Sequence, residues 1–236
     1  MQIDRKNKKT MKDKPDHLGH RQRLREKYRK IGLSGWHDYE ILELILTYCI
    51  PRRDAKPAAK RLMRKFKTVG AVLDASEEEL RKVRDIGPNS AVLLKLFREV
   101  AGVYLKSHLK KSDSLSSPEA VCDYLAVSLR GRKEEEFKII FLDSSNRLIE
   151  VKTLQVGTVD KSAIYPRKVV ERALRYGAVS VIAAHNHPGG SLKPSEDDVR
   201  ITEALRTSLA TVDISLLDHI IVSNEGYFSF KEKGLL

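Results

Sequence analysis

The sequence predicts two domains, a small all-α domain followed by an α/β domain. Residues 35–106 show helical spacing of apolar residues, with no run that is typical of a strand. Residues 110–118 (KKSDSLSSP) are polar, rich in serine and without periodicity, as in a linker. Beyond them β-branched runs alternate with helical segments, which indicates an α/β fold. The 236 residues, 41% of them hydrophobic, suffice for packed cores.

Four short helices are predicted in the first domain, residues 35–109, and they are separated by proline, glycine and capping residues. The third helix has the clearest start, because Ser76 and Glu79 form a capping box in which each side chain satisfies a free amide. The predicted helices begin at Asp38, after Asp54, after Ser76 and after Pro88.

Residues 1–34 are predicted to be a basic arm that is disordered at its beginning. The arm has no apolar core of the kind found in secretory signals. The apolar run 41–50 contains Glu43 and is much shorter than the roughly 20 residues of a membrane-spanning helix. The two cysteines, Cys49 and Cys122, do not indicate a disulfide scaffold. We therefore expect a soluble, cytoplasmic protein.

The second domain, residues 119–236, is predicted to begin with a helix that starts near Pro118. A β-hairpin follows, because two apolar stretches flank a turn-like Ser-Ser-Asn. Two further helices and three further strands complete the expected α/β domain. The predicted hairpin strands are 137–142 and 148–156, the later strands 179–184, 216–223 and 227–230, and the later helices 166–176 and 196–210.

Charge is distributed unevenly between the two halves of the chain. Residues 1–112 carry 28 Lys and Arg against 14 Asp and Glu, a net charge of +14, whereas the remainder carries −2. A strongly basic half is typical of proteins that bind polyanions such as nucleic acid. The alternative is a basic domain whose charges serve only to keep it solvated.

Two histidines directly follow the predicted buried strand 179–184. Because alternate residues of an extended segment point the same way, His185 and His187 can present both imidazoles to one metal ion. A zinc site needs at least three protein ligands. The sequence Pro-Gly-Gly turns the chain after His187, and the helix that follows places Asp198 in its first turn, where it supplies the third ligand.

Each part of this cluster also has an ordinary structural interpretation. A single histidine is usually a hydrogen-bonding residue, and Ser195 with Asp198 fits a simple capping box. The conjunction of two histidines two residues apart, a forced turn and an aspartate at a helix start favours a metal site. The capping role is compatible with it.

The residues resemble a known family pattern. His-x-His, seven residues, Ser, two residues and Asp is the signature of the JAMM (JAB, MPN+) zinc metalloproteases, and His185, His187, Ser195 and Asp198 match it. The segments HNHPGGSLKPSEDD, GTVDKSAIYPRKVVERAL and LLDHIIVS are similar to the bacterial RadC (UPF0758) proteins. The resemblance covers nearly the whole chain and implies a JAMM-type α/β fold of the cytidine-deaminase-like class.

The resemblance also implies roles for several residues. It implies a Zn²⁺ cofactor held by the two histidines and Asp198, with Ser195 donating a hydrogen bond to a developing oxyanion. JAMM enzymes use a glutamate at the start of an upstream strand as the base, and here Glu135 is the choice, with Glu136 the close alternative. Asp218 and His219 receive no ligand role, and their position suggests local hydrogen bonding, with support of a metal ligand as the alternative.

The segment that joins the third and fourth predicted helices resembles a helix-hairpin-helix element. In that motif the hairpin amides and the following helix bind a DNA phosphate without reading bases. A Gly-Pro pair is also common in turns that simply separate two helices. The candidate contact residues are Lys82, Arg84, Gly87, Asn89 and Lys95.

These observations lead to a hypothesis about function and to two alternatives. The hypothesis is a zinc-dependent hydrolase of the metallopeptidase or isopeptidase type that acts on a peptide or protein substrate. The basic half would bring it to nucleic acid, expected to be DNA bound without sequence preference. One alternative is a DNA-binding repair or recombination accessory protein with a structural or inactive metal site. The other is a metal-dependent nuclease.

Overall fold

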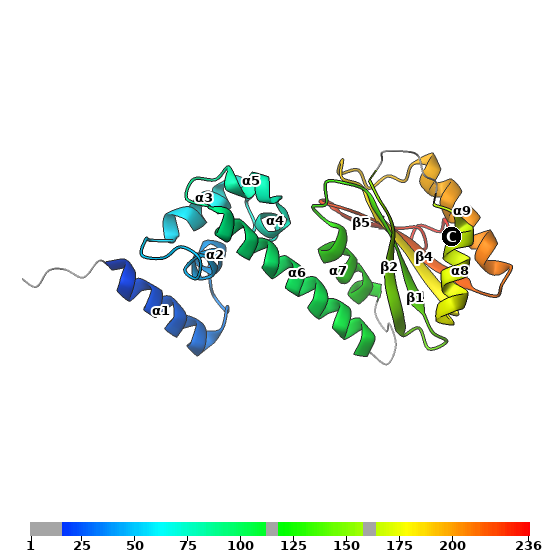
Figure 1. The fold of residues 1–236 in the computed structure, drawn as a ribbon, viewed down its shortest axis with the longest axis horizontal. Coiled ribbons are helices and arrows are strands. Elements are labelled where there is room, and N and C mark those ends of the chain that lie inside the picture. Colours follow the sequence, from blue (N-terminus) through cyan, green and yellow to red (C-terminus); the bar gives the residue numbers. More distant parts are fainter. Residues whose placement is uncertain (1–15, 112–117, 158–163) are drawn as a thin grey trace, which may run out of the picture. The chain divides into compact units, whose positions relative to one another are not determined.

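The computed structural model describes residues 16–111, 118–157 and 164–236 (Figure 1). The start of the predicted arm, most of the predicted linker and the GTVDKSA segment from residue 158 on lie outside the described residues. The chain forms two compact units. Unit 1 comprises residues up to Leu73 and Glu77–Leu94, and unit 2 comprises Asp74–Ser76 and Lys95–Leu236.

Unit 1 is helical, as predicted, and the predicted helix starts agree with the observed ones. The second predicted helix is preceded by Asp54, whose carboxylate accepts a 2.9 Å hydrogen bond from the amide of Lys56. Fully buried leucines from four helices form the core, among them Leu42, Leu62 and Leu80. The helices are α1 (Asp16–Ile31), α2 (Asp38–Leu46), α3 (Lys56–Phe66), α4 (Val69–Asp74), α5 (Glu77–Arg81) and α6 (Pro88–Lys111).

Helix α1 lies within the segment that the sequence predicts as an arm, so the described part of that arm is ordered. Its Arg21 guanidinium donates to the backbone carbonyls of Ile50 and Arg53, each at 2.5 Å, just beyond the end of α2. These carbonyls have no helical partner of their own, and the arginine satisfies them. Helix α4 was not predicted either.

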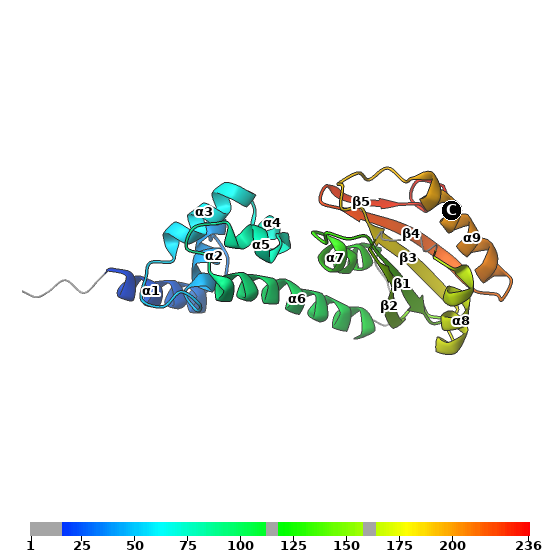
Figure 2. The ribbon, with the colours of Figure 1, turned by 45° about the horizontal axis from the view of Figure 1, so that its top comes forward.

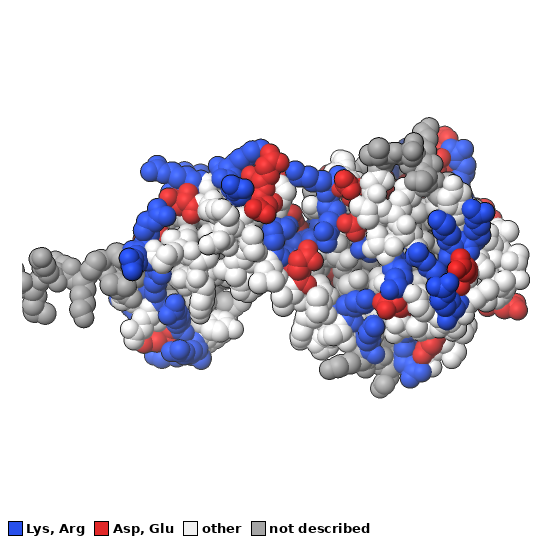
Figure 3. All heavy atoms as spheres, in the orientation of Figure 1, with Lys and Arg blue, Asp and Glu red and all other residues white. Residues whose placement is uncertain are grey.

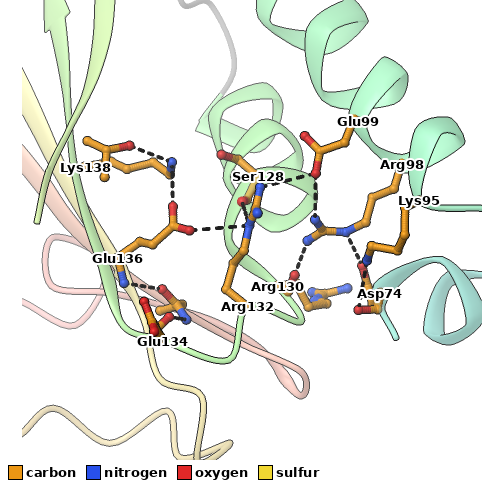
Figure 4. Close-up of polar contacts among 12 residues, drawn as sticks. Asp74, Lys95, Arg98, Glu99, Ser128, Arg130, Arg132, Glu134, Glu136 and Lys138 are labelled. Atoms are coloured by element: carbon orange, nitrogen blue, oxygen red, sulfur yellow. Dashed lines mark hydrogen bonds and ion pairs between the residues drawn. The ribbon is translucent and has the colours of Figure 1, made fainter. Parts of the chain in front are cut away.

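The division between the units falls within α6, between Leu94 and Lys95, and not at the predicted linker 110–118. The second half of α6 belongs to unit 2, where its Leu109 is buried in the core. The turn Asp74–Ser76 belongs to unit 2 because Arg98 of α6 reaches it, with Nε donating to the Asp74 carboxylate at 2.8 Å (Figure 4).

Unit 2 is an α/β unit whose described residues form a five-stranded mixed sheet of order β2-β1-β3-β4-β5. All neighbouring strands are antiparallel except β3 and β4, which are parallel. The predicted hairpin is β1 with β2. The elements are α7 (Pro118–Leu129), β1 (Glu136–Leu142), β2 (Leu148–Val156), α8 (Pro166–Tyr176), β3 (Ser180–Asn186), α9 (Glu196–Ala210), β4 (Ser215–Ser223) and β5 (Gly226–Ser229).

Helices cover both faces of this sheet (Figures 1 and 2). Helix α7 packs on one face, against a core that includes Ile140 of β1 and Val222 of β4. Helices α8 and α9 pack on the other face, against a core that includes Phe137 and Phe141 of β1. Alternate residues of β1 therefore enter opposite cores.

Within the described residues, no helix is both long enough and apolar enough to cross a membrane.

Candidate metal centre

The first candidate ligand, His185, is the last but one residue of β3. His185 pairs with Phe137 of β1, and its ring stacks on the Phe137 ring with centroids 5.8 Å apart. Because directly opposed residues of antiparallel strands share a face, His185 lies on the α8–α9 side of the sheet. The imidazole is fully buried. β3 starts one residue later and ends two residues later than predicted, so it includes His185 itself.

Three side chains converge at this point. Nε2 of His185 lies 2.9 Å from Nε2 of His187 and 3.0 Å from Oδ1 of Asp198. Nε2 of His187 lies 3.4 Å from Oδ2 of Asp198. Bonds of 2.0–2.1 Å to a tetrahedral zinc ion separate two ligands by about 3.3 Å, so the three groups fit around such an ion. His185, His187 and Asp198 form a cluster that can hold a metal ion.

The second nitrogen of each imidazole is fixed by a partner. Nδ1 of His187 donates to the carbonyl of Ser191 at 2.8 Å, in the turn that follows the two histidines. Nδ1 of His185 lies 2.8 Å from Nε2 of His219, which is fully buried in β4. With a proton on both Nδ1 atoms, both Nε2 lone pairs point into the cluster. This is the tautomer that metal ligation requires.

His219 in turn contacts α9. Its Nδ1 lies 2.6 Å from Oγ1 of Thr202, and that hydroxyl donates to the carbonyl of Asp198 at 2.5 Å. Donors and acceptors alternate without conflict if His219 is neutral and carries its proton on Nδ1. Burial, followed by the neighbouring His185, holds the pKa of His219 well below its ordinary value, which keeps the ring neutral.

Asp198 is held by the start of α9. Ser195 is the N-cap of this helix and forms the predicted capping box with Asp198. The amide and the hydroxyl of Ser195 both donate to Oδ2 of Asp198 at 2.7 Å, which leaves Oδ1 directed at His185. The box thus fixes Oδ2, which also lies near His187, and orients the carboxylate toward the cluster.

Two pKa shifts report on this charge arrangement. Burial opposes ionisation of Asp198, but hydrogen bonds from His185 and His187 outweigh it and place its pKa far below the ordinary value. The pKa of His187 is raised, first by its hydrogen bond to Asp198, against the opposing effect of burial. The negative charge of Glu135 contributes to the same rise, so Glu135 lies close enough for its field to reach His187.

The two candidate bases are adjacent residues where β1 begins: Glu136 is its first residue and Glu135 directly precedes it. Glu135 comes two residues before Phe137 and so continues toward the face that carries His185. The Glu136 carboxylate lies instead 3.0 Å from Nζ of Lys138 and 3.5 Å from Nε of Arg132 (Figure 4). This geometry favours Glu135 as the carboxylate that serves the cluster.

The predicted nucleic-acid contacts lie in the segment from the end of α5 into α6. Lys82 pairs with Glu78 on α5, and Arg84, Gly87 and Asn89 are exposed around the start of α6. Lys95 differs, because its half-buried ammonium donates to the carbonyl of Ala75 at 3.0 Å (Figure 4). Its pKa is lowered, chiefly by burial. Its ammonium is therefore engaged within the fold, whereas the other four predicted contact residues are exposed.

Sequence reasoning missed the residues that support the cluster. For His219 we favoured local hydrogen bonding over a role in supporting a ligand, whereas it contacts the candidate ligand His185 on the neighbouring strand. The sequence did contain a signal. A histidine inside the apolar run LLDHIIVS is expected to be buried, and a buried imidazole needs a polar partner. The partner becomes evident only from the parallel pairing of β3 with β4, in which His219 lies opposite Ala183.

A mixed sheet covered by helices, with a His-His-Asp cluster at the end of a central strand, defines a JAB-type domain with a candidate metal site. A family model described as the RadC-like JAB domain matches residues 115–235. The chain is also 40% identical to UPF0758 protein FN0909 of Fusobacterium nucleatum subsp. nucleatum over 228 residues. That match covers 94% of this chain and 98% of the relative. The chain belongs to the RadC (UPF0758) family.

Proposed function

We propose that unit 2 is a zinc-dependent hydrolase of amide or isopeptide bonds, with the JAMM-type fold of the cytidine-deaminase-like class. The observation that carries this proposal is the convergence of two imidazole nitrogens and the carboxylate of Asp198, with contacts of 2.9 to 3.4 Å. A fourth position remains for water, since zinc is normally four-coordinate and catalytic sites have three protein ligands. Nitrogen and carboxylate donors suit zinc, and the neutral tautomers described above suit it as well.

The chain supplies the groups that such a hydrolysis needs. Zinc, when bound, acidifies water and polarises a carbonyl group. Glu135 accepts the proton of the attacking water and passes it to the leaving amine. Ser195 donates to the oxyanion of the substrate. Its exposed hydroxyl can turn toward substrate without releasing Asp198, because the Ser195 amide also bonds that carboxylate at 2.7 Å.

The experiment that tests this proposal combines metal analysis with turnover. Zinc content and cleavage of a panel of peptide, isopeptide and DNA substrates are measured for the wild type, His187→Ala and Glu135→Gln. Glu134→Gln is the matched control, because this neighbouring glutamate is exposed. We expect one zinc ion per chain, and peptide or isopeptide cleavage that the first two substitutions abolish and the control retains.

The other outcomes of the same experiment distinguish the alternatives. Zinc binding without turnover of any substrate by the wild type contradicts the hydrolase and favours a structural metal site. Cleavage of DNA alone, lost in His187→Ala, favours a metal-dependent nuclease.

We further propose that unit 1 binds nucleic acid through the hairpin between α5 and α6, as a helix-hairpin-helix element. Cations of α3 lie against this hairpin: Arg61 forms an ion pair with Asp85 and donates to the carbonyl of Arg84 at 3.1 Å. Figure 3 shows Lys and Arg side chains over the visible surface of this unit. The proposed surface combines Lys82, Arg84, Gly87 and Asn89 with a basic cluster in and beside α3, namely Arg52, Arg53, Lys56, Lys60, Arg61, Arg64, Lys65 and Lys67.

A DNA titration at two salt concentrations tests this surface. Charge reversal at Arg84 or Lys60 should weaken binding and flatten its salt dependence, because each phosphate contact adds to the slope. Arg206→Glu is the control, since this exposed arginine lies on α9 in unit 2. Binding that is unaffected by salt, or that Arg206→Glu weakens equally, would contradict the assignment.

A further inference from the structure

Asn186 occupies the position between the two candidate histidine ligands. It is the last residue of β3 and is buried, with 2% of its surface exposed. A buried amide side chain carries both donors and acceptors, and these must be satisfied. Its partners therefore indicate what it does.

Both partners of the Asn186 side chain are backbone groups of one short segment. Oδ1 accepts a hydrogen bond from the amide of Glu136 at 2.8 Å. Nδ2 donates to the carbonyl of Glu134 at 3.0 Å. The two bonds flank Glu135, the proposed base. The orientation of the amide is unambiguous, because one partner can only donate and the other can only accept.

This arrangement replaces sheet pairing where β3 ends. The pairing of β1 with β3 extends to Phe137 opposite His185. One residue past Asn186, the backbone bonds elsewhere, because the amide of His187 donates to Val222 of β4 at 2.9 Å. The chain just before Glu136 therefore lacks a β3 backbone partner, and the Asn186 side chain supplies one. On the side away from β3, the backbone carbonyl of Glu135 accepts a hydrogen bond from the amide of Gly157 at 2.9 Å.

Resting on the proposed function, we propose that Asn186 is a positioning residue that fixes Glu135 relative to the metal ligands. Asn186 is the chain neighbour of both His185 and His187. Its hydrogen bonds therefore fix the position of segment 134–136 relative to both imidazoles. Such a bond matters because a misplacement of about 1 Å in a catalytic group can reduce a rate by about a hundredfold. Glu136 cannot take over this position, since its carboxylate is held by Lys138 and Arg132 on the other face of β1.

Amide hydrogen exchange of the full-length chain, with and without zinc, tests the structural part of the inference. In Asn186→Ala we expect the Glu136 amide to exchange on the order of tenfold faster, because a buried hydrogen bond is lost. The Gly157 amide should also exchange faster, whereas the amides in the middle of β1 should not. Asn224→Ala is the matched control, because Asn224 is exposed in the turn after β4.

Asn186→Asp provides a second variant that separates the two bonds. A carboxylate still accepts from the Glu136 amide but cannot donate to the Glu134 carbonyl. In Asn186→Asp we expect the Glu136 amide to remain protected from exchange, whereas the bond to the Glu134 carbonyl is lost. Unchanged exchange in Asn186→Ala overturns the inference. So does equal acceleration throughout unit 2 in both variants, because Asn186 would then support the whole fold.

Metal affinity and a double-mutant cycle test the functional part. Zinc affinity should change by less than about threefold in Asn186→Ala, because the side chain contacts neither imidazole nitrogen. On a cleaved substrate, kcat should fall by roughly tenfold to a hundredfold at nearly constant KM. The double variant Asn186→Ala, Glu135→Gln should be no slower than Glu135→Gln alone, whereas independent effects would multiply.

The two proposals fail in different ways. If no substrate is cleaved, the hydrolase proposal fails while the exchange data still decide whether Asn186 holds the segment. If Glu135→Gln leaves a low but measurable rate and Asn186→Ala lowers that rate by its full factor, the positioning role is wrong and the hydrolase stands.

Discussion

The imidazole of His219 lies directly behind that of His185, with Nε2 of the first 2.8 Å from Nδ1 of the second. The contact joins neighbouring parallel strands and continues through Thr202 to the backbone of Asp198. Two of the three candidate ligands are thus linked by one chain of hydrogen bonds that does not pass through the metal position. The cluster is consequently supported by the core between the sheet and α9.

Removal of the His219 ring should weaken metal binding without removing a ligand. In His219→Ala, Nδ1 of His185 loses its acceptor, and outer partners of ligands typically contribute tenfold to a hundredfold in metal affinity. His219→Gln can restore an acceptor and should recover part of the loss. Competition with a chelator measures the affinity, and an unchanged value in His219→Ala would contradict the supporting role.

Metal affinity should depend on pH through His187. Its pKa is raised in the metal-free protein, first by Asp198, so the protonated form is stabilised and a metal ion must displace that proton. Affinity is therefore full above this raised pKa and falls as the pH drops through it, starting above the ordinary imidazole value of about 6.5. Zinc titrations between pH 5.5 and 8.5 measure the slope. Asp198 stays ionised throughout, because its pKa is lowered.

Acid should weaken unit 2 through the contact between α6 and β2. The Lys106 ammonium donates to the Glu150 carboxylate at 2.8 Å, and this bond first, then the Val151 amide, lowers the pKa of Glu150 to about 2. Because the folded-state pKa is lowered, the stabilisation is present above the unfolded value of about 4.3 and is lost as the pH falls toward 2. Glu150→Gln should cost about 1–2 kcal/mol at pH 7 and progressively less below pH 4.

Urea denaturation at several pH values measures this difference. Glu171→Gln is the control, since the Glu171–Arg175 pair on α8 is largely exposed and should contribute little at any pH. A loss of stability in Glu150→Gln that is the same at pH 7 and pH 3 would show that the ion pair is not its cause.

Gly131 should tolerate no side chain. Its φ is +70°, and a Cβ built on it would lie 2.5 Å from the carbonyl oxygen of Asp74. Gly131→Ala must therefore displace backbone as well as adopt a strained conformation, and we expect a loss of about 2 kcal/mol or more. Gly234→Ala is the matched control, because Gly234 has φ +67° and open space around it, and should lose only about 1 kcal/mol. Thermal denaturation compares the two.

The elements of unit 2 were predictable because their signals are local. The hairpin of β1 and β2 follows from two apolar runs around a turn, and α9 follows from the Ser195–Asp198 capping box. Helix α1 was not predicted, because it is attached through the Arg21 side chain to carbonyls beyond α2, which sequence periodicity does not encode. Long-range side-chain bonds of this kind leave no local pattern.

The candidate ligands were predictable for a similar reason, since all three lie within fourteen residues of one another along the chain. Their supports were not. His219 reaches the cluster from β4, and Asn186 bonds the segment that precedes β1, so both contacts depend on the pairing register of β3 with its two neighbours. Register is set by tertiary packing, so no pattern within either strand specifies which residues meet.

The capping box at Ser195 and Asp198 has a consequence for comparing members of this family. Both residues help to start a helix, so a relative that had lost its chemistry would still be under selection to retain them. His187 caps no helix: it is partly exposed, and its hydrogen bond outside the cluster goes to the Ser191 carbonyl in the turn. Its identity in a relative is therefore the more informative sign of whether that protein still handles a metal.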